Sequence, residues 1–308
     1  MRGGHGKLPP STDGDPMPRL RASQLRAYRA RTFRTAPGLR LTSLRQAERF
    51  VQARGFVHFW PIDGVDLPSL WQAVAGARPV PSEHDDPAHV TWRWKDYMLD
   101  KRRWYYGKLL RGRSTMVSLQ TLPAFYALSE RLGDLDDYEL SYEVGHLSRE
   151  ARLIGETLRA SGPTHTIELR RKTRLDDPRA KGRFEKALIQ LQKGLWVLPI
   201  GVAEAGSWRY AFIFELLDRW LPEIFPRARV LSREEAGREL IARLLSGVGA
   251  TTSIQAARLF GWKSAWAEHV LQELGQAGKV IQLEDGRWMT EHLLQGTPRT
   301  QLAARRRG

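Results

Sequence analysis

The chain has 308 residues, 42% of them hydrophobic, which is enough for two or three compact domains with apolar cores. It contains no cysteine, which excludes disulfides, zinc fingers and thiol nucleophiles, and it has no apolar run long enough to span a membrane. Lys and Arg number 49 against 34 Asp and Glu, so the net charge is +15. This surplus predicts a polyanionic partner, unless the charge is spread over the surface and serves only solubility.

The N-terminal part begins with a stretch rich in glycine and proline over residues 1–18. We expect this stretch to be a disordered tail, and it lacks the apolar core of a signal peptide. The next stretch, LRASQLRAYRARTFR, is strongly basic and predicts a helix. A second helix is expected to begin at Thr42 or Ser43, because apolar residues recur on one face after this point.

Residues 59–71 read FWPIDGVDLPSLW and place two carboxylates among apolar and aromatic residues. One interpretation puts Asp63 in a cavity beside aromatic rings, where desolvation would make it more basic and let it activate a water molecule. The other makes Asp63 and Gly64 a turn, with Asp66 capping the helix that LPSLWQAV predicts and Pro68 in its first turn. The residues alone favour the turn, because Asp-Gly is common in turns.

Aromatic and basic residues alternate through residues 91–113, which read TWRWKDYMLDKRRWYYGKLLRGR. Such a mixture is typical of surfaces where Arg and Lys hold phosphates while flat rings stack on exposed bases, and Arg102 and Arg103 are candidate contacts. Alternatively the rings fill the core between modules, and Trp104 or Tyr105 in particular is expected to be buried.

Two blocks of similar pattern follow from Ser148 onward. In each block, three helical stretches precede two β-rich stretches joined by a turn. This order is that of a winged helix, so we predict an α+β, mainly α fold of tandem winged-helix modules with small β-hairpin wings, and the basic N-terminal helices are a candidate degenerate copy. The boundaries expected from this pattern are a basic winged-helix-like module with the aromatic-rich segment at 19–146, a second winged helix at 147–228, a third at 229–292 and a basic C-terminal tail at 293–308.

The first of the two blocks carries a dense cluster of cations around its third helix, the one that enters the major groove in helix-turn-helix proteins. The residues expected to bind a phosphate backbone are Arg171, Lys172, Arg174, Arg179, Lys181, Arg183 and Lys186. Trp208 and Arg209, just after the predicted wing turn, are further candidates. The corresponding helix of the last block carries Glu268 and Glu273, so we expect that block to brace the array or to face another protein.

Metal and cofactor motifs are missing from the sequence. The eight histidines fall in no metal-binding pairing, and there is no nucleophile elbow, no Walker loop and no dinucleotide fingerprint. We therefore expect neither a metal nor a cofactor.

Three fragments together resemble the AlkZ/YcaQ family of bacterial DNA glycosylases, and most closely its AlkZ-related branch. They are FWPIDGVDLPSLW, the segment from WRWKD to RRWYYGKLLRGR, and GATTSIQAARLFGW. The resemblance covers roughly residues 40–292. It implies tandem winged helices around a concave DNA channel without a metal. It also implies removal of bulky N-alkylated purines, with unhooking of interstrand crosslinks by some members.

The catalytic motif of this family, Gln-x-Gln or Gln-x-Asp, aligns with Pro61-Ile62-Asp63. The resemblance therefore implies that Asp63 is the catalytic base and that Trp60 and nearby rings line the lesion pocket. The first motif position departs, because Pro61 replaces a glutamine amide and cannot orient a water molecule. The glutamates and histidine of the crosslink-repair branch have no clear counterpart near residues 113–123.

Three functions are compatible with these observations. The first is a DNA glycosylase-like repair enzyme that cleaves the N-glycosidic bond of alkylated purines by water attack. The second is a non-catalytic winged-helix DNA-binding or regulatory protein that has lost the catalytic glutamine, and the third is a structural or protein-binding module with incidental charge. For the first two we expect duplex DNA as the partner, a monomer because no heptad pattern is present, and a cytoplasmic, nucleoid-associated location.

Overall fold

The computed structural model describes residues 17–82, 85–129, 131, 133–206, 209–290 and 293. Within these residues the chain is mainly α-helical and carries three small antiparallel sheets of three strands each. The predicted α+β, mainly α class is therefore confirmed. Most of the two predicted tails, at 1–18 and 293–308, lies outside the described residues.

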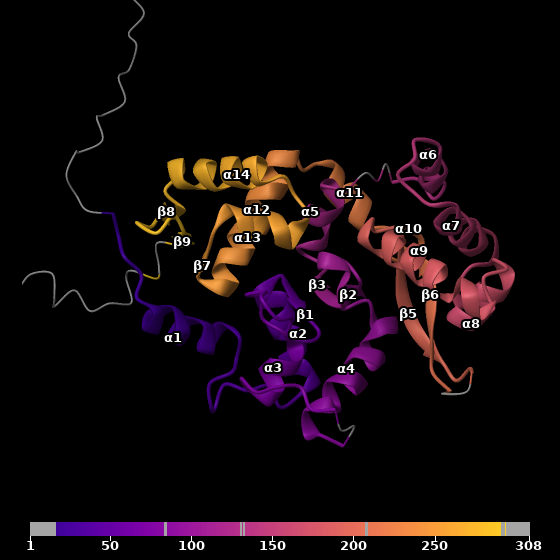
Figure 1. The fold of residues 1–308 in the computed structure, drawn as a ribbon, viewed down its shortest axis with the longest axis horizontal. Helices are drawn as coiled ribbons and strands as arrows, with labels where there is room; N and C mark the ends of the chain where they lie inside the picture. Colours follow the sequence, from indigo (N-terminus) through magenta and orange to yellow (C-terminus); the bar gives the residue numbers. More distant parts are fainter. Residues whose placement is uncertain are drawn as a thin grey trace, which may run out of the picture.

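One arrangement of elements occurs three times in the described part of the chain (Figure 1). Each unit has a helix, a strand, two helices and two strands, and its last strand lies between the other two. The first unit comprises α2 (Leu44–Arg54), β1 (Phe56–His58), α3 (Leu70–Ala75), α4 (Val90–Met98), β2 (Trp104–Gly107) and β3 (Thr115–Ser118). The second comprises α7 (Arg149–Ser161), β4 (Thr164–His165), α8 (Thr166–Lys172), α9 (Lys181–Lys193), β5 (Val197–Ala203) and β6 (Ala211–Leu216). The third comprises α12 (Arg233–Val248), β7 (Ala250–Thr251), α13 (Ser253–Phe260), α14 (Ser264–Gln276), β8 (Val280–Gln282) and β9 (Trp288–Thr290).

The remaining elements precede or connect the units. The longer ones are α1 (Ala22–Thr32), α5 (Leu122–Ala127), α6 (Asp137–Glu143), α10 (Leu217–Trp220) and α11 (Ile224–Arg229). Short 3-10 turns are η1 (Pro87–His89), η2 (Leu99–Lys101), η3 (Leu110–Gly112) and η4 (Pro178–Ala180). Within the described residues, no helix is long and apolar enough to cross a membrane.

The first unit lies between the other two, as Figure 1 shows. One apolar core runs through all three, since buried Phe56, Leu198 and Leu244 belong to the same cluster of packed side chains. Trp104 and Tyr105 of β2 are buried, as predicted, and the Tyr105 hydroxyl donates to the backbone carbonyl of Gln192 at 3.2 Å. The aromatic residues of β2 thus serve the core between the first two units.

The basic helix predicted near the N-terminus is present as α1, but it does not belong to a repeated unit. It packs on the end of α12, where the Tyr28 hydroxyl donates to the Ser246 carbonyl at 2.8 Å and Arg29 Nε donates to the Val248 carbonyl at 2.9 Å. The first unit begins instead at α2, whose predicted cap Ser43 accepts from the backbone N–H of Gln46. Helix α1 therefore covers the open carbonyl end of α12 with polar and cationic side chains.

Candidate functional site

A cavity of about 400 Å³ lies where two loops of the first unit meet. One loop follows β1 and the other joins β2 to β3. The lining residues are Trp60, Pro61, Ile62, Asp63, Lys108, Arg113 and Ser114. The cavity therefore brings the predicted Asp63 and Trp60 together with two cations.

The loop after β1 is closed at its base by backbone hydrogen bonds. The N–H of Phe59 donates to the Ser114 carbonyl at 2.8 Å, and the N–H of His58 donates to the Pro68 carbonyl at 2.9 Å. The N–H of Trp71 reaches back to the Phe59 carbonyl at 3.1 Å. These bonds anchor the loop to the sheet and to α3, so the segment between them projects as one structured unit.

Asp63 lies in a turn at the tip of this loop. The N–H of Val65 donates to the Ile62 carbonyl at 3.1 Å, and Gly64 takes a φ of 70°, which favours glycine. The predicted Asp63–Gly64 turn is thus confirmed, and the same turn places Asp63 at the cavity. The expectation that Asp63 is desolvated is wrong, because the turn leaves its side chain exposed to solvent.

Asp66 does not cap the helix that follows. Helix α3 begins after Ser69, whose Oγ accepts from the N–H of Gln72 at 3.2 Å, so the predicted cap at Asp66 is wrong and Pro68 precedes the helix. Ser69 rather than Asp66 caps α3 because Ser69 lies directly before the first helical residue. Asp66 instead forms an ion pair with Arg29 of α1, with Oδ1 and Nη1 2.9 Å apart.

Trp60 is held by other aromatic rings while it lines the cavity. Its ring centroid lies 4.8 Å from that of Phe59, 5.8 Å from that of Trp92 and 6.2 Å from that of Trp71. The side chain is half-buried, so one part of the indole remains available at the cavity. A ring fixed in this way presents a rigid apolar surface at little entropic cost.

A buried lysine stands behind this aromatic wall. Lys95 of α4 is 1% exposed, its Nζ donates to the Tyr210 hydroxyl at 2.8 Å, and Asp96 is its ion-pair partner at 2.6 Å. The ammonium also lies 4.6 Å from the ring centroid of Phe212 and 4.8 Å from that of Trp92. Burial lowers the pKa of Lys95, and Asp96 opposes this shift. These contacts tie the third helix of the first unit to strand β6 of the second.

The cationic loop of the cavity is supported by α9. The N–H of Lys108 donates to Gln192 Oε1 at 3.0 Å, and Gly112 packs so closely on Ile189 that an added Cβ would lie 3.3 Å from its Cγ2. Lys108, Arg111 and Arg113 form no ion pair with any residue in the described ranges. Burial lowers the pKa of Lys108, Arg113 lowers it further, and Glu185 opposes the shift. The two neighbouring units therefore build this side of the cavity together.

The cations predicted on the second unit are all exposed, and they fall into two groups. Arg171, Lys181 and Arg183 pair with glutamates at 2.7, 3.9 and 3.2 Å. Lys172 Nζ donates to Ser161 Oγ at 3.1 Å and lies 3.9 Å from Glu168. The cations without an ion pair to any described residue are Arg174, Arg179 and Lys186.

The other predicted contacts lie apart from the Asp63 cavity. Arg102 stacks over the ring of Trp220 at 4.2 Å, and Arg103 Nε donates to Glu48 Oε1 at 2.7 Å, beside a hollow of about 170 Å³. Arg209 pairs with Glu204 between strands β5 and β6. Trp208 lies outside the described residues.

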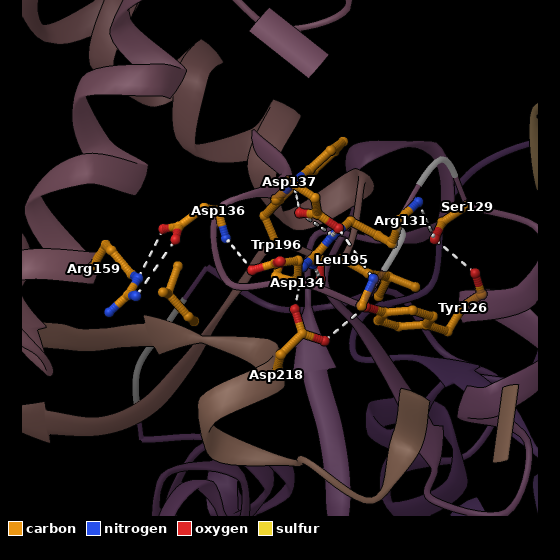
Figure 2. Close-up of polar contacts among 12 residues, drawn as sticks. Tyr126, Ser129, Arg131, Asp134, Asp136, Asp137, Arg159, Leu195, Trp196 and Asp218 are labelled. Atoms are coloured by element: carbon orange, nitrogen blue, oxygen red, sulfur yellow. Dashed lines mark hydrogen bonds and ion pairs between the residues drawn. The ribbon is translucent and has the colours of Figure 1, made fainter. Parts of the chain in front are cut away.

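A second polar cluster is buried between the connector after α5 and the second unit (Figure 2). Arg131 Nε contacts both carboxylate oxygens of Asp137 at 2.9 Å, while its Nη2 pairs with Asp218. The Tyr126 hydroxyl donates to Asp218 at 2.7 Å, and Trp196 Nε1 donates to Asp137 at 3.1 Å. Burial raises the pKa of Asp218, and Arg131 and Tyr126 oppose this shift. These groups satisfy one another, so the cluster is a structural joint between units.

Sequence patterns did not assign Lys95, Lys108, Arg113 or Ser114 to the site. The three cations stand in the basic and aromatic stretch at 91–113, but their spacing alone does not show which loop they share with Asp63. Pairing of β1 with β3 brings the two loops together, and this pairing joins strands far apart in sequence. In the described part of the chain, no cluster of three or more His, Asp or Glu side chains is arranged to hold a metal ion.

Comparisons with known proteins place this fold. A family model described as AlkZ related matches residues 41–261. Among solved structures, the Streptomyces sahachiroi DNA glycosylase AlkZ superposes with a TM-score of 0.53 at 14% sequence identity, covering 89% of this chain and 70% of that one. At this identity the similarity concerns the fold. No curated protein matches the chain. Because the family model spans well over half of the sequence and includes the cavity segment, the chain belongs to the AlkZ-related family.

Proposed function

We propose that this protein binds duplex DNA and hydrolyses the N-glycosidic bond of N-alkylated purines, with Asp63 as the general base. The observation that carries the proposal is the cavity in which Asp63 lies with Trp60, Lys108 and Arg113. Support comes from membership of the AlkZ-related family and from the similar fold of a DNA glycosylase. A carboxylate between an apolar ring and two cations suits a nucleotide, which offers a base, a sugar and a phosphate.

Hydrolysis of the N-glycosidic bond requires from the protein mainly a positioned water molecule and a negative charge near the sugar. The Asp63 carboxylate accepts a proton from a water molecule, whose oxygen forms a bond to C1′ as the bond from C1′ to the base nitrogen breaks. An N7-alkylated purine carries a positive charge and leaves as a neutral base, so no general acid is required. The negative charge of Asp63 also stabilises the cationic sugar that develops in the transition state. The ring of Trp60 supplies the surface for the alkylated base.

Each repeated unit is proposed to be a winged helix, with its last two strands as the wing. The order of helix, strand, two helices and hairpin supports this assignment for all three units. Of the boundaries of the modules proposed at 19–146, 147–228 and 229–292, the one near residue 146 falls in the link before α7, and the one near residue 228 falls in the last turn of α11, shortly before α12. In this assignment α9 is the third helix of the second module, and it adjoins the cavity through Gly112 and Ile189.

The duplex-binding face is proposed to run from the cavity along α9. Arg111 and Arg113 are exposed cations without ion-pair partners among the described residues, and α9 packs beside their loop. Lys186 lies one turn before Ile189 on the same face of α9. Arg174 and Arg179 extend the positive surface through the segment before α9. Cations free of carboxylates are the groups that neutralise phosphates at the lowest desolvation cost.

Incubation with duplex DNA that contains N7-alkylguanine, followed by alkaline cleavage at abasic sites, tests this function. Wild-type protein is expected to give cleaved strands, and Asp63→Asn is expected to lower the rate by about 100-fold or more while duplex affinity stays nearly unchanged. Equal base release by the variant and the wild type would reject Asp63 as the base.

A second candidate function is non-catalytic binding of DNA, and Pro61 favours it. Proline offers no amide to orient a water molecule at the position where the family motif has glutamine, and Asp63 is exposed. This candidate predicts salt-sensitive binding to duplex DNA without an abasic product from any alkylated substrate. The same incubation separates the two candidates, provided that binding is measured in parallel.

A further inference from the structure

Lys108 is the primary amine in the Asp63 cavity. Its side chain is half-buried, lines the cavity and pairs with no carboxylate in the described part of the chain. The backbone of Lys108 is held by Gln192, so the residue is anchored while its amine stays unpaired. Burial and the neighbouring Arg113 both lower the pKa of Lys108, which increases the share of neutral, nucleophilic amine near neutral pH.

Lys95 provides the contrast inside the same unit. It is also buried, but its Nζ is bonded to Tyr210 and Asp96 and is enclosed by aromatic rings. An amine that is 1% exposed cannot reach a bound molecule without breaking these contacts. Lys108 has no such partners and opens on a cavity of about 400 Å³, which has ample volume for a sugar without its base.

We propose that Lys108 forms a covalent imine with the aldehyde of an abasic site, which gives this protein a lyase activity that cuts the DNA strand. The inference rests on the DNA binding of the proposed function but not on hydrolysis of the N-glycosidic bond. An abasic site exists partly as an open-chain aldehyde at C1′. A lysine amine with reduced basicity is the side chain that reacts with carbonyl carbons.

The steps balance without any further reagent. The neutral amine of Lys108 adds to C1′, and uptake of one proton from solvent with loss of one water molecule leaves a protonated imine. The Asp63 carboxylate, in the same cavity, then accepts a proton from C2′, and the electron pair forms the C2′–C3′ double bond as the C3′–O bond breaks. The 3′ phosphate leaves with the downstream strand. Addition of water to the imine releases an unsaturated aldehyde and restores the amine.

The test uses full-length protein and a duplex with one preformed abasic site, and borohydride is added to reduce any imine. Wild-type protein is expected to give a covalent protein–DNA adduct on a denaturing gel, with the DNA attached to the peptide that contains Lys108. Lys108→Arg keeps the positive charge but lacks a primary amine, so adduct formation should fall by about 100-fold or more while affinity for the duplex is retained. Lys279→Arg, at an exposed lysine of the third unit, is the matched control and should leave the adduct yield unchanged.

The possible results separate this inference from the proposed function. Because the abasic site is supplied ready-made, the adduct can form even if the protein releases no alkylated base. Full adduct yield from Lys108→Arg, or no adduct from wild-type protein that binds the abasic duplex, would overturn the lyase inference and leave base hydrolysis untouched. Loss of both adduct and affinity in Lys108→Arg would also overturn it, because it would assign Lys108 to phosphate binding alone.

Discussion

The second and third units share one topology but are attached to the first unit in different ways. The second shares the apolar core with the first unit and is also joined to it by buried Lys95 with Tyr210, while the Arg131 cluster fixes it to the connector that follows the first unit. The third is joined mainly by apolar surfaces, where the ring of Phe260 packs edge-on against Phe56 with centroids 5.6 Å apart, and Arg54 of α2 donates to the Ser246 carbonyl at 3.0 Å. Hydrogen bonds are directional and apolar contacts are not, so the polar joints specify the orientation of the second unit more closely.

The outer surfaces of the second and third units also differ, in how their charged side chains are paired. Helix α9 and the segment before it carry three exposed cations without an ion pair to any described residue. The third unit also has exposed cations, at Arg258, Lys263 and Lys279, but its helix α14 carries Glu268 and Glu273 as well, and Arg238 pairs with Glu273 at 3.0 Å. The last block was predicted to brace the array or to face another protein, and its helix α12 packs against α1, α2 and α5. We therefore propose that the two units have different tasks, the second supplying cations beside the cavity and the third supporting the first unit.

The strongest test of this comparison removes the cation of the polar joint. Arg131→Met removes the cation that Asp137 and Asp218 share, which leaves two carboxylates buried close together, and we expect the free energy of unfolding to fall by about 3–5 kcal/mol. Arg238→Met breaks the half-exposed pair of the third unit and is expected to cost about 0–1 kcal/mol. Urea denaturation of both variants measures the difference, and similar losses would show that the buried Arg131 cluster contributes no more than a half-exposed pair within one unit.

The surface difference can be tested by removing three charges from each unit. Replacing Arg174, Arg179 and Lys186 with Gln should weaken duplex binding by about 100-fold and reduce the slope of log affinity against log salt by about 3. The matched triple variant of the third unit removes the exposed cations Arg258, Lys263 and Lys279. It should change affinity and slope little. Titrations of duplex DNA with each variant at several salt concentrations measure the affinity and the salt slope. Equal effects of the two triple variants would mean that both units contact the duplex.

The apolar joint between the first and third units contains a titratable group, His58. Its expected effect on the free energy of unfolding is slightly smaller than the effects predicted above. His58 is 1% exposed and lies on the same face of β1 as Phe56, which contacts α13. Burial lowers the pKa of His58 to about 4, and Arg111 and Arg113 act in the same direction. The backbone of Ser114 opposes part of this shift without forming a hydrogen bond of ordinary geometry.

The sign of the resulting pH dependence follows from this lowered pKa. His58 binds a proton near pH 6.5 in the unfolded chain but only near pH 4 in the folded chain. The contribution of neutral His58 to the free energy of unfolding is therefore fully present above pH 6.5 and is lost as the pH falls toward 4. Between pH 7.5 and 4.5, His58 should remove about 2.5 kcal/mol from the free energy of unfolding. His58→Leu should abolish that part of the pH dependence, as measured by urea denaturation at both pH values. An unchanged pH profile would show that the pKa of His58 is the same in the folded and unfolded states.

Sequence patterns predicted the second and third units well and the first unit poorly. The helices of residues 148–290 show apolar periodicity with clear caps, and the Asp285–Gly286 turn marks the last hairpin. In the first unit, a long loop follows β1 and another precedes α4, so the aromatic stretch does not show the repeat. The two-residue strands β4 and β7 are too short to leave a pattern, and they exist because β6 and β9 pair with them.

The residues of the candidate site could also be predicted only in part from the sequence. Asp63 and Trp60 were recognised from one contiguous segment, because the family motif and the turn signal both lie within it. Lys108 and Arg113 could not be assigned, since their place depends on the register of β1 with β3. The position of Asp66 depends on α1, a helix that packs on the far end of the chain. Contacts between distant segments therefore decide most of what the sequence patterns missed.

The smallest expected effect concerns the link from the third unit to the cavity loop. Arg29 donates to the Val248 carbonyl and pairs with Asp66, whose side chain is 53% exposed. Asp66→Asn should therefore cost only about 0.5 kcal/mol of stability, whereas Ser69→Ala removes the cap of α3 and should cost about 1 kcal/mol. Thermal or urea unfolding of the two variants shows which substitution costs more stability. A larger loss from Asp66→Asn would mean that the tether to α1, rather than the cap, holds the loop that carries Asp63, and base release by that variant should then fall as well.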